Sequence, residues 1–182
     1  MTHKDLIIPA YKWVLKRSCG IAFKELNTAA CNGEYPDVIG FGAWGYSVLI
    51  EVKVSRSDFI CDKKKKFRKD PELGMGKLRY YLCPEGLIKV TELPKGWGLL
   101  YANSKLKITS IHNPYKHDRI NGILGHPGFK QNIKAEHGLM YSALRRLHTK
   151  GHLDSIYDKQ YIYGHQEPVS QEYMPPNQLG LF

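Results

Sequence analysis

The sequence has no run of about 18 apolar residues, the length that a membrane-spanning helix requires. The first residues also lack the apolar stretch and the small-residue cleavage site of a signal peptide. Its 4 cysteines are scattered and form no Cys-x-x-Cys pair, which argues against a zinc site and against a disulfide framework. We therefore expect a cytoplasmic protein with free thiols, no zinc and no membrane partner.

Acidic residues are fewer than basic residues. The 182 residues include 17 Asp and Glu and 27 Lys and Arg, which gives a net charge of +10. Most of the excess lies in residues 1–110, which hold 19 basic and 11 acidic residues. The densest run, residues 63–69, is basic except for Phe67. This clustering indicates a polyanionic partner, although a run of charges can also be a solvated helix face.

The hydrophobic periodicity predicts an α/β protein with an α-β-β-β-α-β core around a mixed sheet, followed by a C-terminal helix and an extended tail. We expect three parts: a core over 1–111, an irregular loop and helix over 112–165, and a flexible tail over 166–182. The expected helices are 5–17, with Pro9 in its first turn, 57–69, and 131–149, with Ile133, Met140, Leu144 and Leu147 on one face. The expected strands are 21–27, 37–41, 46–54, 78–83, 97–101 and 106–111.

The third expected strand carries two charges in an otherwise β-branched segment. Glu51 and Lys53 are two residues apart, so both side chains point to the same face. Burying them is costly, so either they serve a function or one face of an edge strand lies in water. Asp37 opens the preceding strand, and its carboxylate can converge with that of Glu51 if the two strands are neighbours.

Two such carboxylates would form a site for Mg²⁺ or Mn²⁺. The metal can polarise a phosphodiester and lower the pKa of its bound water. Lys53 can then orient or deprotonate the attacking water and stabilise negative charge on the phosphorus.

Pro36-Asp37 and Glu51-Val52-Lys53 together resemble the signature of the PD-(D/E)xK nucleases. Residues 51–59, followed by Asp62-Lys63, are similar to the motif E-hydrophobic-K-x-S-R-x-D-F of the MmcB-like branch, a group of small DNA-repair proteins. The similarity covers roughly residues 20–103, and it departs from the branch at residues 64–66, where an aromatic residue is expected.

The resemblance implies a restriction-endonuclease-like core and a Mg²⁺-dependent deoxyribonuclease with Asp37, Glu51 and Lys53 as catalytic residues. Asp37 and Glu51 would hold the metal. Glu25 matches an acidic residue of the branch and would be the third ligand, unless it is an ordinary surface residue.

The basic run follows the expected active-site strand and is expected to lie along the DNA backbone. Ser55 and Arg56, just beyond the metal residues, are further candidates for phosphate contacts. The expected DNA-binding residues are Ser55, Arg56, Lys63, Lys64, Lys65, Lys66, Arg68 and Lys69. Ser57 or Asp58 is expected to cap the basic helix, and Asp62 is expected to pair with its lysines.

The last five residues are Gln178-Leu179-Gly180-Leu181-Phe182, after a proline-containing segment with little apolar periodicity. Exposed leucine and phenylalanine lower solubility unless a partner covers them. The pattern resembles the pentapeptide by which bacterial repair and replication proteins bind the DNA sliding clamp, and a short peptide with apolar anchors suits such recognition. We expect Gln178, Leu179, Leu181 and Phe182 to contact the clamp; the alternative is a tail that folds back onto its own domain.

The sequence therefore predicts a metal-dependent DNA nuclease that the sliding clamp recruits during DNA repair or replication. One alternative is a non-catalytic DNA-binding adaptor of the same fold, tethered to the clamp. Another is a restriction-type endonuclease, for which the roughly 70 residues after the core leave little room for a specificity domain.

Overall fold

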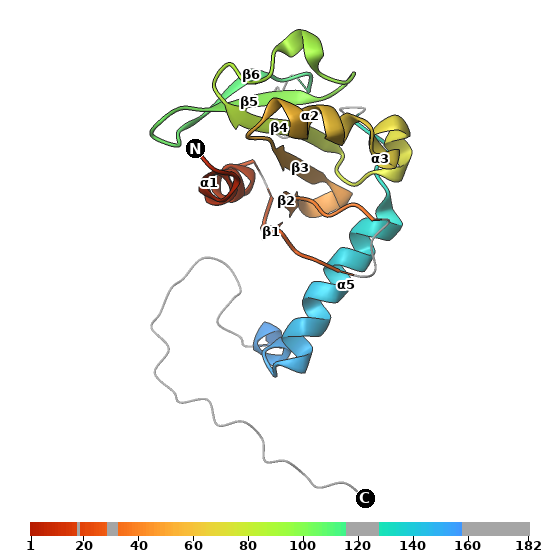
Figure 1. Cartoon of the computed structure of the whole chain (residues 1–182). Helices are drawn as coiled ribbons and strands as arrows, with labels where there is room; N and C mark the ends of the chain where they lie inside the picture. The colour runs from red at the N-terminus through yellow and green to blue at the C-terminus, as the bar shows by residue number, and fades with distance from the viewer. Residues whose placement is uncertain (18, 29–32, 116–127, 158–182) are drawn as a thin grey trace, which may run out of the picture. The chain divides into compact units, whose positions relative to one another are not determined.

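The computed structural model describes residues 1–17, 19–28, 33–115 and 128–157. A six-stranded mixed sheet is flanked by helices, which confirms the α/β fold and the order of elements expected for the core (Figure 1). The strands are β1 (Ile21–Lys24), β2 (Val38–Phe41), β3 (Ser47–Val52), β4 (Leu78–Pro84), β5 (Gly98–Ala102) and β6 (Ile108–His112). The α-helices are α1 (His3–Leu15), α2 (Arg56–Lys63), α3 (Lys66–Lys69) and α5 (Ile133–Thr149). The 3₁₀ helices are η1 (Ala43–Gly45), η2 (Pro71–Leu73), η3 (Val90–Glu92) and η4 (Leu153–Tyr157).

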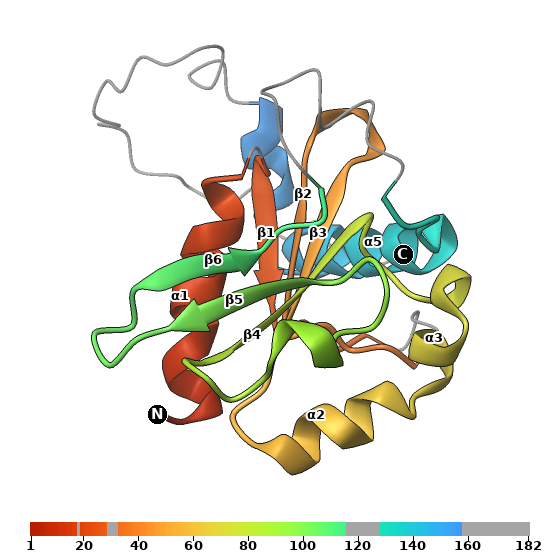
Figure 2. The ribbon, with the colours of Figure 1, turned by 90° about the horizontal axis from the view of Figure 1, so that it is seen from above.

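The strands lie in the sheet in their sequence order (Figure 1), and Figure 2 shows β5 and β6 side by side. The first three strands are antiparallel neighbours, β3, β4 and β5 run parallel, and β6 returns antiparallel to β5. A parallel pair needs a long crossover connection, and α2 and α3 lie in the crossover between β3 and β4. The segment after Lys53 is therefore attached directly to the end of a central strand.

Helix α1 begins at His3 because Thr2 caps it. The Thr2 hydroxyl accepts a hydrogen bond from the Asp5 amide at 3.3 Å, and the Asp5 carboxylate accepts one from the Thr2 amide at 2.7 Å, a reciprocal capping box. Pro9 consequently lies inside the helix, so its predicted place in the first turn is wrong. The early start extends the helix toward the ends of β1 and β2 that carry Glu25 and Asp37.

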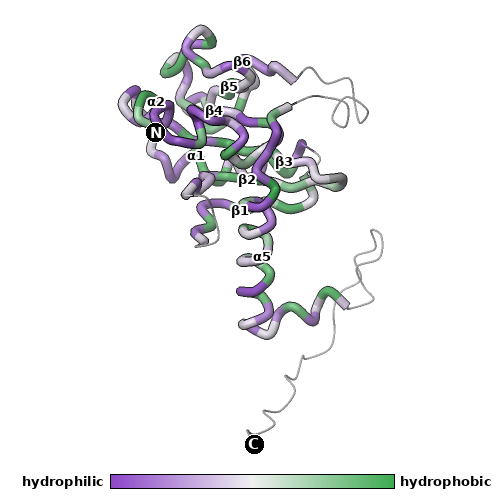
Figure 3. The backbone as a smooth tube through the Cα atoms, turned by 90° about the vertical axis from the view of Figure 1, so that its right-hand side faces the viewer, coloured by the Kyte–Doolittle hydropathy of each residue, from purple (hydrophilic) through white to green (hydrophobic). Residues whose placement is uncertain are grey.

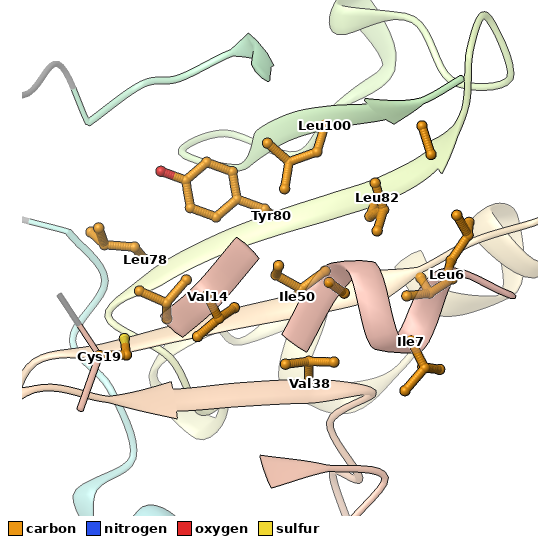
Figure 4. Close-up of a cluster of buried hydrophobic side chains, with 14 of the residues drawn as sticks. Leu6, Ile7, Val14, Cys19, Val38, Ile50, Leu78, Tyr80, Leu82 and Leu100 are labelled. Carbon is orange, nitrogen blue, oxygen red and sulfur yellow. The ribbon is translucent and has the colours of Figure 1, made fainter. Parts of the chain in front are cut away.

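One face of the sheet packs against α1 mainly through apolar side chains. Leu6, Ile7 and Val14 of α1 lie beside Val38 and Ile50 of the sheet (Figure 4). The approach is close at Gly40, where a Cβ atom would stand 2.2 Å from the Val14 Cγ1 atom. The buried apolar side chains of this face hold α1 against the sheet.

The opposite face has a second apolar core and, beside it, the charged residues of interest. Phe59 of α2 and Phe67 of α3 are buried there, and Leu139 of α5 joins them. The hydropathy colouring of Figure 3 shows the apolar stretches of β2 and β3 that supply both cores. Leu49 and Glu51 of β3 belong to this second face, because side chains alternate along a strand.

The basic segment forms two short helices, not the single helix expected over residues 57–69. α2 ends at Lys63, Lys64 is its C-cap residue, and Lys65 is extended before α3. The N-cap is Ser55, whose hydroxyl accepts from the Asp58 amide at 3.1 Å, so the expected cap at Ser57 or Asp58 is wrong. The break between the helices turns Phe67 and Arg68 inward.

The apolar face expected on α5 is largely exposed: Ile133, Leu144 and Leu147 are all exposed, and the buried residues are Ala135, Glu136 and Leu139. The chain divides into two compact units, Met1–Ala143 and Leu144–Phe182. In the part of the chain that the structure describes, no helix is long and apolar enough to cross a membrane, and Cys19, Cys61 and Cys83 are free thiols.

Candidate active site

The predicted acidic residues lie in one row across the sheet. The register pairs Val38 with Ile50, which places Asp37 and Glu51 opposite one another at the adjoining ends of β2 and β3. On the other side, the Glu25 amide donates to the Asp37 carbonyl at 2.9 Å. Opposed residues of neighbouring strands share a face, so Asp37 and Glu51 point to the same side of the sheet. Glu25 follows the end of β1 with a φ of 46° and lies beside the Asp37 backbone.

Local backbone contacts orient the Asp37 carboxylate. Its Oδ2 atom accepts a hydrogen bond from the Val52 amide at 2.7 Å, which ties it to the end of β3. Its Oδ1 atom lies 3.2 Å from the His3 Nε2 atom at the start of α1. One Asp37 oxygen is therefore bound by the backbone at the end of β3, and the other lies beside the His3 ring.

Glu25 occupies the outer end of the row. Its side chain is 54% exposed, and its Oε1 atom lies 3.7 Å from the His3 Nδ1 atom. Glu25 thus lies beside Asp37 but toward solvent, and the His3 ring lies near both carboxylates. His3 was not anticipated as a site residue; only the early capping of α1 brings it here.

Glu51 is buried, with 2% of its surface exposed, and each of its oxygens faces a cation. The Lys53 ammonium lies 3.0 Å from Oε2, and the Arg68 guanidinium lies 3.1 Å from Oε1. Burial raises the pKa of the Glu51 carboxyl to about 7, with Asp37 and Asp62 adding to the rise and the two cations opposing it.

Lys53 continues the line of β3, since its amide donates to the Leu82 carbonyl at 2.9 Å. Its ammonium is buried between Glu51 and Asp62, whose Oδ1 atom is 3.5 Å away. Burial alone would lower the pKa of Lys53, but the surrounding carboxylates outweigh it and raise that pKa. Lys53 is therefore a charged group at neutral pH.

Asp62 is a central member of the site. It is buried on the inner side of α2, where it accepts hydrogen bonds from the Tyr81 hydroxyl at 2.7 Å and the Arg68 Nε at 2.9 Å, and pairs with Lys65 at 2.8 Å. Burial opposes ionisation, but Arg68 and Lys53 hold its pKa far below the usual range. The expected pairing with a helix lysine is present, and the inward contacts were missed. One signal was available: Phe59 and Asp62 are spaced for one helix face.

Arg68 does not lie on the DNA-binding surface that the sequence predicted. Its side chain is 1% exposed and pairs with Glu34, Glu51 and Asp62. The guanidinium also lies 4.8 Å from the ring centroids of Phe67 and of Trp97. These carboxylates outweigh burial and raise the pKa of Arg68, so it is a permanent buried cation that organises the acids.

Glu34 is a further buried acid that the sequence analysis missed. It binds Arg68 and also accepts a hydrogen bond from the Met75 amide at 2.6 Å. Its partners Arg68 and Met75 are 34 and 41 residues away in sequence, so no local sequence pattern predicts these contacts. Glu34 fixes the segment that leads into β2 and Asp37.

Ser55 and Arg56 both have hydrogen-bond partners within the protein. The Ser55 hydroxyl caps α2. The Arg56 guanidinium forms two hydrogen bonds with the Glu92 carboxylate, one of them 2.7 Å long, and donates to the Leu87 carbonyl. Arg56 therefore connects α2 to η3 and is 48% exposed, and the expected phosphate contacts of both residues stay a prediction.

The lysines of the basic run differ in their contacts. Lys63 donates to the Glu92 carbonyl at 3.0 Å and its ammonium lies over the Phe59 ring. Lys65 pairs with Asp62 but remains 48% exposed. We use the name basic rim for the exposed lysines beside the acids: Lys64, Lys65, Lys66 and Lys69.

Two hollows adjoin at the acidic cluster. The carboxylate hollow, of about 310 Å³, is lined by His3, Tyr35, Asp37, Glu51, Val52, Lys53, Asp58, Cys61, Asp62 and Lys65. The lysine hollow, of about 350 Å³, is lined by Gly33, Glu34, Tyr35, Glu51, Lys65, Lys66 and Phe67. Volumes of about 300–1,000 Å³ are typical of ligand pockets.

The donor set permits a divalent cation with few protein ligands. Asp37 lies beside His3, and Glu51 lies between Lys53 and Arg68. Mg²⁺ typically uses one or two carboxylates and keeps several waters, which Asp37 and Glu51 can satisfy. Among the described residues, no group of three or more His, Cys, Asp or Glu side chains is arranged to hold a metal, so a full set of protein ligands is not preformed.

The four expected clamp contacts, Gln178, Leu179, Leu181 and Phe182, lie outside the described residues. So do residues 166–177, which the sequence assigns to the tail.

No protein-family model matches this sequence, and no curated protein matches it either. A solved structure similar to this chain is SPO1766, a protein of unknown function from Silicibacter pomeroyi. It is 18% identical, the match covers 92% of this chain and 99% of that chain, and the TM-score is 0.53. At this identity the likeness shows the fold alone.

Proposed function

We propose that the protein is a metal-dependent DNA nuclease whose site is the carboxylate hollow. The observation that carries the proposal is the placement of Asp37 opposite Glu51, with the Lys53 ammonium 3.0 Å from the Glu51 carboxylate. Two oxygen donors and a cation in one hollow suit phosphodiester hydrolysis. The resemblance to the PD-(D/E)xK signature supports the same reaction.

A bound Mg²⁺ or Mn²⁺ would polarise the phosphodiester and activate water. Asp37 and Glu51 would hold it, with the Val52 amide keeping Asp37 in place. Lys53 remains an ammonium because its pKa is raised, so it stabilises negative charge on the phosphate and does not take the proton from water. Arg68 and Asp62 keep Glu51 and Lys53 in position from the buried side.

A non-catalytic DNA-binding adaptor is the second candidate, and one observation favours it. Both Glu51 oxygens already face cationic side chains, so the acid is neutralised without a metal. Such a protein would bind DNA through the basic rim and leave it intact.

Cleavage assays separate the two candidates. Labelled duplex, flap, fork and single-stranded DNAs are incubated with the protein in Mg²⁺, in Mn²⁺ and in chelator. The nuclease cuts at least one of these substrates in metal and none in chelator. Binding without cleavage in every condition identifies the adaptor.

We also propose that the sliding clamp recruits the protein to DNA, and that the protein acts in the cytoplasm. It is supported by the sequence of the last five residues. Burying each apolar anchor contributes roughly 1.5–3 kcal/mol before the cost of ordering the peptide, so an affinity near micromolar is expected. Titration of a purified bacterial clamp against the intact chain and a chain lacking residues 178–182 tests it, and equal binding by both contradicts it.

A further inference from the structure

Tyr35 stands where the two hollows meet. Of the described residues, three line both hollows: Tyr35, Glu51 and Lys65. Glu51 is buried at the junction, Lys65 is held by Asp62, and Tyr35 is 56% exposed. A ligand that occupies both hollows therefore lies against the Tyr35 side chain.

The backbone on both sides of Tyr35 is anchored. Glu34 is buried and bound by the Met75 amide and Arg68, and Pro36 is buried before β2. A proline restricts the residue before it to extended conformations. The backbone of Tyr35 is therefore held in place, so less conformational entropy is lost when a ligand stacks on its ring.

The lysine hollow combines this ring with positive charge. Lys65 and Lys66 line it, and Lys66 is exposed. An aromatic face next to lysines is the combination by which proteins bind single-stranded nucleic acid, with bases stacked on the ring and phosphates beside the cations. In an intact duplex the bases are stacked on each other and their faces are not available to a side chain.

We infer that the substrate has an unpaired nucleotide next to the phosphate that is cut. Its base stacks on Tyr35 and its phosphate meets Lys66 in the lysine hollow, while the scissile phosphate lies in the carboxylate hollow. This rests on the proposed nuclease function and narrows its substrates to single strands, flaps and frayed ends.

The test is binding to single-stranded and duplex oligonucleotides that carry 2-aminopurine at successive positions, with Ca²⁺ in place of Mg²⁺. Tyr35→Leu is expected to weaken single-strand binding about tenfold and to leave duplex binding unchanged. Tyr35→Phe keeps the ring and should bind as the wild type does. In the wild type, quenching of 2-aminopurine should peak at one position, and Tyr35→Leu should remove that peak.

The chain offers matched controls for both residues. Tyr141 of α5 is also 56% exposed and lines neither hollow, so Tyr141→Leu should change nothing. Lys64 is exposed and lines neither hollow, so Lys64→Ala should weaken single-strand binding less than Lys66→Ala. Circular dichroism of each variant confirms that it is folded.

The inference is overturned if Tyr35→Leu binds single strands as tightly as Tyr141→Leu, if it weakens duplex binding equally, or if the wild type binds no single-stranded DNA. The nuclease proposal has its own test. If Tyr35→Leu loses stacking but the wild type cleaves no DNA, the single-strand site is supported and the nuclease proposal is wrong. Cleavage of single strands and flaps by Tyr35→Leu at the wild-type rate keeps the reaction and removes the stacking role.

Discussion

The two faces of the sheet are built from the same strands and differ in what they bury. On the α1 face, Val48, Ile50 and Val52 of β3 belong to an apolar cluster. On the opposite face, the alternate residues Leu49 and Glu51 belong to a layer that holds buried carboxylates and their cations beside an apolar core. A buried ion pair is weak support for stability, because desolvation offsets much of its attraction. Both faces therefore stabilise the fold by apolar packing, and the second face also holds an ionic cluster that stability alone does not explain.

The largest expected effect is a loss of cleavage rate when a site carboxylate or Lys53 is removed. Asp37→Ala, Glu51→Ala and Lys53→Ala should each lower the cleavage rate by at least about 10²–10⁴-fold while DNA binding is largely kept. The measurement is single-turnover cleavage of the best substrate in Mg²⁺. The control is Glu85→Ala, an exposed acid at the end of β4. Cleavage by Glu51→Ala at the wild-type rate would show that Glu51 is not a catalytic residue.

Arg68 and Lys69 are adjacent basic residues with opposite environments. Arg68→Met leaves Glu34, Glu51 and Asp62 without their shared cation, and a loss of about 3–5 kcal/mol in the free energy of unfolding is expected. Lys69→Met, at an exposed position, should change it by no more than about 0.5 kcal/mol. Urea denaturation measures both. Equal midpoints for the two variants would mean that the ionic cluster contributes nothing that an apolar side chain cannot replace.

The pH dependence of stability distinguishes the faces in a second way. The Glu51 pKa of about 7 is above its ordinary value of 4.5, so the folded protein binds more protons than the unfolded chain between these values. Stability is therefore lost as pH rises through this window, by up to about 1.4 kcal/mol per pH unit from this group. Glu51→Gln should flatten the curve measured by urea denaturation in chelator.

Other buried acids do not disturb this comparison. The pKa of Glu136 is also raised by burial, but Glu136 is present in both proteins and cancels in the difference. Ile50→Val on the α1 face should lower the whole curve by about 0.5–1.5 kcal/mol and keep its slope. Parallel curves for the wild type and Glu51→Gln would show that Glu51 does not titrate in this window.

The basic rim should give the smallest effect, spread over all DNA sequences. Reversing Lys64, Lys66 and Lys69 to Glu should weaken DNA binding and flatten its salt dependence, by about 0.9 in the logarithmic slope for each duplex phosphate that a lysine no longer neutralises. The control reverses Lys95, Lys105 and Lys107, which are also exposed and change the net charge equally. Binding titrations over a range of salt concentrations compare the two, and equal slopes would make the rim an ordinary solvated surface.

Much of the fold and part of the site were predictable from local pattern. Alternation along residues 46–54 and helical spacing in residues 5–17 are properties of neighbouring residues, and they located β3 and α1 to within a few residues. Asp37, Glu51 and Lys53 followed from the same local reasoning, since antiparallel neighbours place strand ends side by side. The start of α1 and the break after Lys63 were missed, because they depend on a cap at Thr2 and on the burial of Phe67 and Arg68.

The sequence by itself determined the order of helices and strands, the excess of positive charge and the placement of Glu51 and Lys53 on one side of a strand, because each depends on residues close together in the chain. Only the tertiary structure decided which basic residue turns inward and which acids meet it. Arg68 joins Glu34, 34 residues away, with Glu51 and Asp62, while its neighbour Lys69 remains in solvent. The physical reason is that a buried charge is tolerated only where opposite charges converge on it, and that convergence is produced by the packing of α2 and α3 against the sheet.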